Sequence, residues 1–304
     1  MKIGIYMIVK NEEEMLPRCL ESIKDFDAIY IADTGSTDKT VEIARKYTKH
    51  VYTSYKWEDS FCKARNFILS KVWKNKDIDW LLVIDADEYL ENTYEQVKKV
   101  LEQAEASLVN VKCKAEKSGV LHDSPRLHKN TPEIFWNKTH DAHNLLNATS
   151  REFSDIVIVY GYSPAHKKDK DRTMRILLKT LSEHPEQTRE KYYLAREYYD
   201  RKLWQKAIDM YDSYIKDSKF LSEKNDAWLI RARCLAELGK YVEACDSAWE
   251  AIKYNANFEE ALRFIGGHMD EGNKEAWYKF ADIADNRNVL FVRSKKDKDK
   301  KEKK

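Results

Sequence analysis

The sequence predicts an α/β domain with a mostly parallel sheet, followed by an all-α domain. Two observations point to this fold class. In the first half of the chain, short apolar runs alternate with stretches of helical periodicity, and such alternation gives parallel sheets with helices on both faces. From about residue 170 onward the pattern is helical throughout. We expect an α/β domain over residues 1–168, a helical domain over 169–292 and a disordered charged tail over 293–304.

Length and composition agree with two folded domains. The chain has 304 residues, 42% of them hydrophobic and 35% charged, which suits two cores under a highly charged surface. A net charge of only +2 argues neither for nor against a nucleic-acid partner. The five cysteines form no CxxC pair, so we expect reduced thiols and neither a zinc site nor a disulfide framework.

The sequence contains no recognisable membrane-spanning or secretory segment. No apolar stretch approaches the roughly 20 residues that a membrane-spanning helix needs. The first apolar run, residues 3–9, indicates a short strand rather than a signal peptide, because no basic segment of useful length precedes it. We therefore expect a cytoplasmic protein, with any membrane association being peripheral.

The first hundred residues divide into alternating strands and helices. Asn11 follows the first strand and precedes three glutamates, which indicates a helix N-cap with acids in the first turn. Asp33 ends the second strand, and residues 34–38 form a turn before the next helix. The expected strands are 3–9, 28–32, 51–52 and 80–84, and the expected helices are 15–23, 39–47, 60–74 and 93–104.

Between about 106 and 165 the pattern changes to strands separated by polar loops. The expected strands are 109–113, 126–128 and 156–160. The whole chain contains only eight glycines, so Gly119 and Gly161 are expected to mark turns.

The helical half contains an internal repeat. A pattern ending in Ala207 recurs 37 residues later, ending in Ala244, and a weaker third unit places Ala276 32 residues further on. Small residues at fixed positions with aromatics between them are typical of tetratricopeptide repeats, although an ordinary helical bundle is the alternative. The first repeat helix is strongly aromatic, and its tyrosines are expected to pack in the core rather than form a binding stripe: Tyr192, Tyr193, Tyr198 and Tyr199.

The segment after the fourth strand is strongly acidic. An apolar run over 80–84 ends in Asp85 and Asp87, with Glu88 directly after. Carboxylates at the carboxyl end of a buried strand point toward the crevice where open α/β sheets bind ligands. Their mutual repulsion indicates a cation between them, and hard oxygen ligands suit Mg²⁺ or Mn²⁺ carrying a diphosphate. The alternative is an acidic helix start.

Three further polar groups follow strands or open helices at the same expected sheet edge. They lie at 7–13, 32–40 and 57–66. Together with the acidic segment they could surround a nucleotide, in which Asp33 accepts from a base or ribose and Arg65 pairs with a phosphate. Each group alone could be a turn, a cap or a surface ion pair, but four in one order are harder to explain in that way.

These four groups resemble the nucleotide-sugar motifs of family 2 glycosyltransferases of the GT-A fold. The matching stretches are 8–12, 33–38, 64–66 and 82–88. Further matches resemble the branch of lipopolysaccharide-core glucosyltransferase-like enzymes and bacteriocin-modifying peptide S-glycosyltransferases, which also carry a tetratricopeptide domain. They lie at 125–130, 136, 139–141, 161–163, 166 and 171–177, so that the likeness covers roughly 280 residues.

The resemblance implies a metal-dependent, inverting transfer from a nucleoside-diphosphate sugar, expected to be UDP-linked glucose or N-acetylglucosamine. Mn²⁺ or Mg²⁺ would be held by Asp87, Asp85 and His166. Asp141 would be the catalytic base, although the branch usually has Glu there, and Glu133 is the substitute. A structural role is expected for His140, as for most single histidines, with contact to the diphosphate or metal as the alternative. The expected donor contacts are Val9, Asn11, Glu12, Asp33, Gly35, Ser36, Asp38, Arg65, Asp85, Ala86 and Arg126.

The acceptor and the partners are less narrowly defined. A saccharide, a polypeptide and a modified DNA base are all conceivable acceptors, through a hydroxyl or a thiol. In the bacteriocin-modifying relatives the helical domain looks like a dimerisation and acceptor platform, which implies a homodimer. The alternatives are a tetratricopeptide scaffold with a degenerate transferase domain and a nucleotidyltransferase. Intact Asp85, Asp87 and Arg65 argue against the scaffold, and the lack of a glycine-rich phosphate loop argues against the nucleotidyltransferase.

Overall fold

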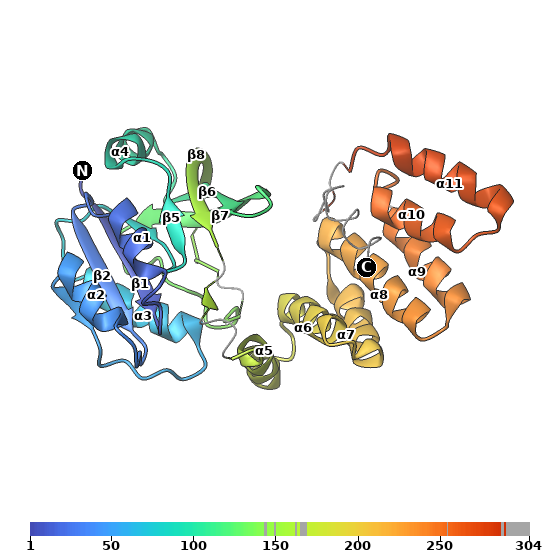
Figure 1. The fold of residues 1–304 in the computed structure, drawn as a ribbon, viewed down its shortest axis with the longest axis horizontal. Coiled ribbons are helices and arrows are strands. Elements are labelled where there is room, and N and C mark those ends of the chain that lie inside the picture. Colours follow the sequence, from blue (N-terminus) through green and yellow to red (C-terminus); the bar gives the residue numbers. More distant parts are fainter. Residues whose placement is uncertain are drawn as a thin grey trace. The chain divides into compact units, whose positions relative to one another are not determined.

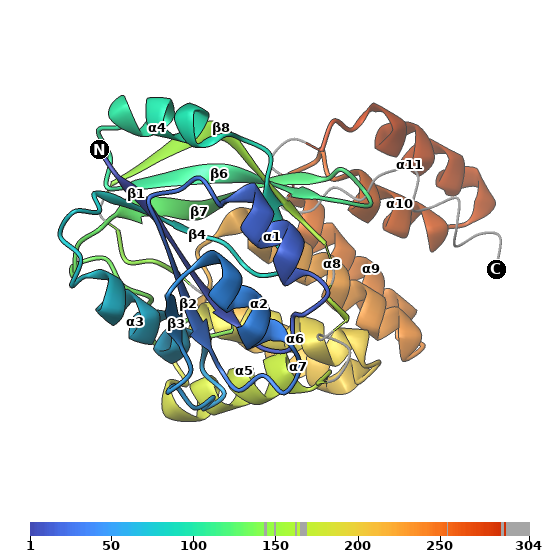
Figure 2. The ribbon, with the colours of Figure 1, turned by 60° about the vertical axis from the view of Figure 1, so that its left-hand side comes forward.

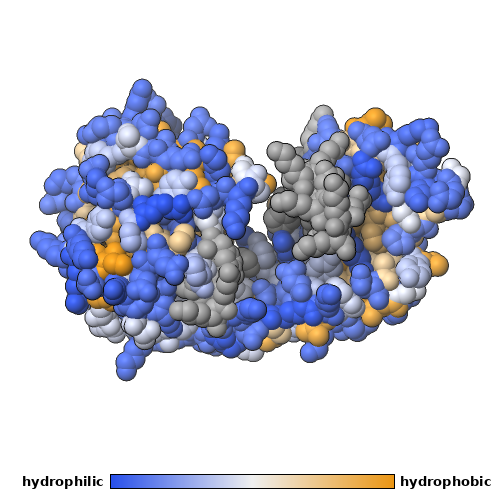
Figure 3. Space-filling view, viewed as in Figure 1, coloured by the Kyte–Doolittle hydropathy of each residue, from blue (hydrophilic) through white to orange (hydrophobic). Residues whose placement is uncertain are grey.

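The computed structural model describes residues 1–142, 145–148, 150–161, 163–164, 169–253, 255–286 and 289. The chain forms two compact units, Met1–Ile176 and Leu177–Lys304 (Figures 1 and 2). The expected domain boundary at 168/169 thus lies a few residues before the division between the units. Hydrophilic side chains dominate the visible face of the first unit, as the high content of charged residues predicts (Figure 3).

The first unit is an eight-stranded sheet with helices on both faces. The strand order is β3-β2-β1-β4-β7-β6-β8-β5. Its elements are β1 (Ile3–Val9), α1 (Leu16–Ser22), β2 (Ala28–Asp33), α2 (Thr40–Tyr47), β3 (His50–Tyr52), α3 (Phe61–Val72), β4 (Trp80–Val83), β5 (Glu88–Leu90), α4 (Tyr94–Glu102), β6 (Leu108–Ala115), β7 (Leu121–Lys129) and β8 (Arg151–Tyr160).

Four of the seven pairings among the described strands are parallel, which confirms the predicted mostly parallel α/β class. β1 lies between β2 and β4 and runs parallel to both, so the carboxyl ends of these strands meet at one edge. The order of strands along the sheet reverses here, and ligands bind at such points in α/β folds. β7 then joins β4 in the antiparallel direction and extends the sheet toward β6.

Apolar side chains on each face of the sheet pack against a separate group of helices. One core cluster joins β1 and β4 to α1, α2 and α4, through residues such as Leu20, Ala44 and Leu101. The other packs α3 against the opposite face through Ile68 and Leu69 (Figure 2). Strand residues alternate between the two clusters, which is why the central strands appear as continuous apolar runs in the sequence.

One local expectation was wrong, and one short strand was not predicted. Asn11 is not an N-cap, because its backbone is left-handed at φ 55° and α1 begins only at Leu16, capped by Met15. Asn tolerates this conformation better than most residues, and a turn over the glutamates replaces the expected first helical turn. The acidic segment also continues into a short strand, β5, which pairs antiparallel with β8. Three residues of extended chain are too short for a periodicity argument to detect.

The second unit is helical throughout its described part. Its helices follow α5 (Arg172–Glu183), which spans the division between the units. They are α6 (Thr188–Asp200), α7 (Trp204–Asp217), α8 (Leu221–Glu237), α9 (Tyr241–Lys253), α10 (Glu259–Gly267) and α11 (Glu271–Ile283), and successive helices pack as pairs (Figure 1). No helix in the described ranges is long and apolar enough to cross a membrane.

The first two repeats confirm the tetratricopeptide-like pattern. Ala207 and Ala244 are fully buried between their helices, and Tyr192 and Tyr198 are buried in the core as expected. The third alignment was wrong, because Ala276 is exposed. Close approach in that unit occurs instead at Gly266 of α10, where an added Cβ would lie 2.8 Å from the Cβ of Trp277.

Candidate functional site

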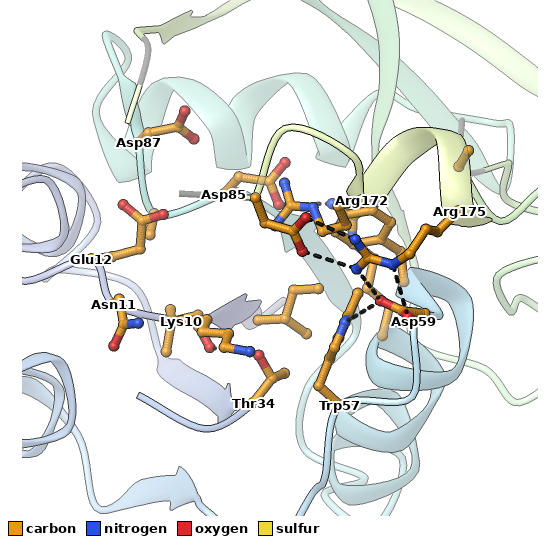
Figure 4. A pocket seen from close by; sticks show the side chains of 17 residues that line it. Lys10, Asn11, Glu12, Thr34, Trp57, Asp59, Asp85, Asp87, Arg172 and Arg175 are labelled. Carbon is orange, nitrogen blue, oxygen red and sulfur yellow. Dashed lines mark hydrogen bonds and ion pairs between the residues drawn. The ribbon is translucent and has the colours of Figure 1, made fainter. Parts of the chain in front are cut away.

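The carboxyl ends of β1, β2 and β4 open onto a cavity of about 640 Å³ within the first unit (Figure 4). This volume is typical of small-ligand sites. The cavity is lined by Ile8, Val9, Lys10, Asn11, Glu12, Thr34, Trp57, Asp59, Phe61, Arg65, Asp85, Ala86, Asp87, Ala142, Asp169, Arg172 and Arg175. The structure therefore brings together seven of the expected donor and metal residues: Val9, Asn11, Glu12, Arg65, Asp85, Ala86 and Asp87.

The loops after β1 and β2 are tied to each other by side-chain hydrogen bonds. The Asn11 backbone N–H donates to Ser36 Oγ at 2.9 Å, and Asn11 Oδ1 accepts from the Thr37 N–H at 2.7 Å. The Glu12 N–H donates to Thr40 Oγ1 at 2.7 Å, and Asp38 accepts from the Thr40 N–H at 3.0 Å. Ser36 and Asp38 therefore shape the rim of the cavity without being among its lining residues.

The Asp33 carboxylate forms its hydrogen bonds within its own turn. Its carboxylate accepts from the backbone N–H groups of Gly35 and Ser36 at 3.1 Å, and only 4% of the residue is exposed. Gly35 has φ 109°, which a residue with a Cβ rarely adopts. Asp33 and Gly35 do not line the cavity, whereas the neighbouring Thr34 does.

Two arginines neutralise the acid that follows β4. Arg65 Nη2 of α3 donates to Asp85 Oδ1 at 2.7 Å, and Arg126 Nη1 of β7 lies 3.6 Å from Asp85 Oδ2. Arg126 Nη2 also donates to Glu88 Oε1 at 2.6 Å, while Glu88 Oε2 accepts from the Asp85 N–H at 2.8 Å. Burial raises the pKa of Glu88 against the opposing charge of Arg126. Arg126 thus lies behind the acids rather than on the cavity wall.

A series of buried polar contacts holds Arg65 in place. The Arg65 guanidinium stacks on the Trp136 ring at 4.6 Å, and Trp136 Nε1 donates to the Tyr6 hydroxyl at 3.0 Å. That hydroxyl lies 3.0 Å from His128 Nε2, and burial lowers the pKa of His128 to about 4, so the imidazole is neutral. These contacts fix the orientation in which Arg65 meets Asp85.

Glu12 and Asp87 place a second pair of acids on the cavity wall. Glu12 Oε2 accepts from Ser163 Oγ at 2.6 Å, and the Asp87 carbonyl accepts from the Gly161 N–H at 3.2 Å. Burial raises the pKa of Glu12 to about 7, the Ser163 hydrogen bond opposes this shift, and the negative charge of Asp87 adds to it. A bound cation would relieve this repulsion.

The Glu12 carboxyl should make stability depend on pH. Because its pKa rises from 4.5 to about 7 on folding, the folded state keeps a proton that the unfolded state loses between these values. We expect this term to increase the free energy of unfolding as pH falls from 7 to 4.5. Urea denaturation of wild type and Glu12→Gln at several pH values measures the difference, with exposed Glu14→Gln as control.

The comparison with Glu12→Gln is needed because titration of His128 changes the free energy of unfolding in the opposite direction as pH falls. Its pKa falls from 6.5 to about 4 on folding, so its contribution to stability is lost as pH falls through this range. A wild-type pH profile parallel to that of Glu12→Gln would contradict the expected role of Glu12.

The expected base Asp141 lies next to a residue of the cavity wall, whereas its substitute Glu133 does not line the cavity. Asp141 Oδ1 accepts from the Cys62 N–H of α3 at 2.7 Å, and Asp141 is buried next to Ala142, which lines the cavity. His140 accepts through its carbonyl from the Cys62 thiol at 3.6 Å. Glu133 is exposed and does not line the cavity. His166 lies outside the described residues.

The far wall of the cavity contains residues to which we assigned no role from the sequence alone. Asp59 has a left-handed backbone at φ 51°, accepts from Trp57 Nε1 at 2.9 Å and pairs with Arg175 of α5 at 3.0 Å. Trp57 and Asp59 precede Arg65 in one of the motifs, and Arg172 and Arg175 fall in a resembling stretch. The sequence signal was present, but the contact between Asp59 and Arg175 spans 116 positions and could not be inferred.

The chain resembles known glycosyltransferases over most of its length. SunS of Bacillus subtilis, a prophage-derived glycosyltransferase, is 29% identical over 255 residues, which cover 78% of this chain and 59% of SunS. A tetratricopeptide-repeat-containing protein of Synechococcus elongatus is 37% identical over 138 residues, 44% of this chain and 33% of that protein. The chain thus spans less than two thirds of the length of both relatives.

A solved structure shares the fold. Residues 1–349 of TarS from S. aureus, in complex with UDP-GlcNAc, superpose with a TM-score of 0.51 at 15% identity, covering 83% of this chain and 91% of that one. At this identity the likeness shows the fold alone. The family model described as glycosyl transferase family 2 matches residues 4–163, more than half of the chain. The chain therefore belongs to glycosyl transferase family 2.

Proposed function

We propose that the protein transfers a sugar from a UDP-linked donor, with inversion at the anomeric carbon, to a hydroxyl or thiol of an acceptor. The observation that carries this proposal is the convergence of Glu12, Arg65, Asp85 and Asp87 on one cavity at the carboxyl ends of the parallel strands. The UDP-GlcNAc bound to TarS on the same fold supports a uridine nucleotide as donor. Glucose and N-acetylglucosamine are the sugars that we propose.

The residues present fit a divalent cation shared with the donor. Among the residues that the structure describes, no three His, Cys, Asp or Glu side chains form a metal site by themselves. Mg²⁺ is commonly held by one or two carboxylates together with substrate phosphates. Arg65 and Arg126 already neutralise Asp85, so Asp87 is the carboxylate that we assign to the metal, with Asp85 next to it. When bound, the cation neutralises charge on the diphosphate.

The protein's own residues orient the donor and accept a proton. The acceptor atom attacks the anomeric carbon from the face opposite the diphosphate, the bond from that carbon to the phosphate oxygen breaks, and UDP leaves with the electron pair. We propose Asp141 as the base that takes the acceptor proton. Its Oδ1 accepts from the Cys62 N–H at the start of α3, which fixes the orientation of the carboxylate. We propose a saccharide, polypeptide or modified DNA base as acceptor and a homodimer as the assembly.

Replacing Asp141 separates a catalytic from a structural role. Asp141→Asn keeps an oxygen that can accept from the Cys62 N–H, so we expect little change in stability but a loss of roughly 10²- to 10⁴-fold in kcat. Asp141→Ala should also destabilise the fold by about 0.5–2 kcal/mol, because a helix N-terminus loses its acceptor. UDP release and thermal unfolding measure the two effects. Wild-type turnover in Asp141→Asn would assign Asp141 to structure alone.

Donor binding tests the proposed function directly. Thermal unfolding of the whole chain is followed with UDP-glucose, UDP-N-acetylglucosamine, GDP-mannose and ATP, each with and without Mn²⁺. We expect stabilisation by a UDP-sugar, larger when Mn²⁺ is present, and none by ATP. If no nucleotide sugar stabilises the protein, the proposal of a sugar transferase is wrong.

A further inference from the structure

Two arginines on the first turn of α5, Arg172 and Arg175, line the cavity. Figure 4 shows them with Asp59 and Trp57 on one side of the cavity, facing Glu12 and Asp87 on the other. Both come from the end of the first unit, far in sequence from the strands that supply the acids. The two arginines differ in their hydrogen-bond and ion-pair partners, which indicates different roles.

Arg175 is fully engaged with protein carboxylates. Its Nη1 and Nη2 donate to Asp169 at 2.8 and 2.9 Å, and its Nη2 also donates to Asp59 Oδ1 at 3.0 Å. These two carboxylates more than balance its single charge and fix the first turn of α5 against the loop before α3. Arg175 therefore has little capacity to bind a ligand anion without first breaking these pairs.

Arg172 forms no direct pair of this kind with a described residue, although its charge helps to lower the pKa of the Asp169 carboxyl. Its guanidinium stacks on the Phe61 ring at 5.0 Å, its Nε is buried without a hydrogen-bond partner, and it forms no ion pair with another described residue. The residues of the first unit that the structure leaves undescribed include no Asp or Glu, so they cannot supply a carboxylate. A half-buried guanidinium next to a ligand cavity is thus left with donors to satisfy.

Together with the cation proposed at Asp87, the pairing of the lining cations makes an anion the fitting partner of Arg172. Arg65 is paired with Asp85, and Arg175 with Asp59 and Asp169. Arg172 and the exposed Lys10 are the lining cations without an ion pair to a described residue. A guanidinium offers two parallel N–H donors that match a phosphate, and stacking on a ring keeps that fork in one plane.

Given the proposed function, we infer that Arg172 binds the diphosphate of the nucleotide sugar from the side opposite Asp87. It donates N–H groups to the phosphate oxygens and balances the negative charge that UDP gains as the sugar leaves. The donor's diphosphate would then lie between two positive charges of different origin, the cation at Asp87 and the guanidinium of Arg172.

The affinities for UDP and for uridine test this inference, because the two ligands differ by the diphosphate alone. Titration calorimetry measures UDP with Mn²⁺, and ligand-observed NMR measures uridine. We expect Arg172→Ala to weaken UDP binding by roughly 10- to 100-fold and to leave uridine binding unchanged. Arg172→Lys keeps the charge but loses the fork, so it should recover part of the affinity.

Arg151→Ala is the matched control, since Arg151 is exposed and begins β8. The end of β8 near the cavity is the other one, where Gly161 follows the strand and contacts Asp87. Thermal unfolding without ligand checks that each variant is folded. UDP binding at wild-type strength in Arg172→Ala, or an equal loss for uridine, would overturn the inference and leave the proposed function intact. Failure of the wild-type protein to bind UDP would instead count against the proposed function.

Discussion

Asp87→Ala is expected to lower the rate of sugar transfer by roughly 10²- to 10³-fold. A divalent cation stabilises the leaving diphosphate by several kcal/mol, and each 1.36 kcal/mol changes a rate about tenfold. Asp87 is the cavity acid that we assign to this cation, because Asp85 is already paired with Arg65 and Arg126. The same variant should abolish the part of UDP-sugar stabilisation that depends on Mn²⁺. UDP release and thermal unfolding with and without Mn²⁺ measure both effects.

Asp77→Ala is the control for this experiment, because Asp77 is exposed and lies far from the carboxyl end of β4. It should behave as wild type in both assays. If Asp87→Ala keeps its Mn²⁺-dependent stabilisation by the donor, the cation is held elsewhere and the assignment of Asp87 is wrong.

Arg126→Met is expected to cause the largest loss of stability, about 3–5 kcal/mol. The substitution leaves Glu88, which is 5% exposed, without the Arg126 cation and removes one of the two arginines near Asp85 in the described part of the chain. Breaking a buried ion pair from one side costs this much because the remaining charge stays buried and uncompensated. Urea denaturation at pH 8, where Glu88 is charged in the unfolded state, measures the change in the free energy of unfolding.

Two comparisons isolate the cause of this loss. Combining Arg126→Met with Glu88→Gln removes the stranded charge and should recover part of the stability. Lys112→Met breaks the exposed pair between β6 and β8, Lys112 with Asp155, and should cost much less stability than Arg126→Met because solvent screens this pair. Equal losses in Arg126→Met and Lys112→Met would show that burial does not set the cost of the Arg126 substitution.

The sequence predicted the parts of the site that depend on local pattern. Apolar runs ending in Asp33 and Asp85 placed both residues at the carboxyl ends of parallel strands, where the structure has them. It did not predict what each acid contacts. The Asp33 carboxylate accepts hydrogen bonds from the backbone of its own turn. Asp85 instead pairs with an arginine on α3 and lies near another on β7. Such pairings depend on tertiary packing, about which periodicity carries no information.

The same limit explains the errors in local structure. Asn11 and the following glutamates have the composition of a helix start. The backbone N–H groups of Asn11 and Glu12 instead donate to the hydroxyls of Ser36 and Thr40, which hold the chain in a turn. In the helical unit, spacing alone selected Ala276 as the small packing residue, whereas contact with Trp277 selects Gly266. In both cases a contact with another element of the fold, and not the local pattern, decides the outcome.

The position of β7 between β4 and β6 has a consequence for biosynthesis. The acids after β4 leave the ribosome well before Arg126, which lies about forty residues further on. Until β7 docks, β4 is an unprotected edge strand and its acidic end has no arginine from the far side. The nascent chain therefore completes this edge of the cavity late, and a product truncated before residue 121 would expose a pairing edge prone to aggregation.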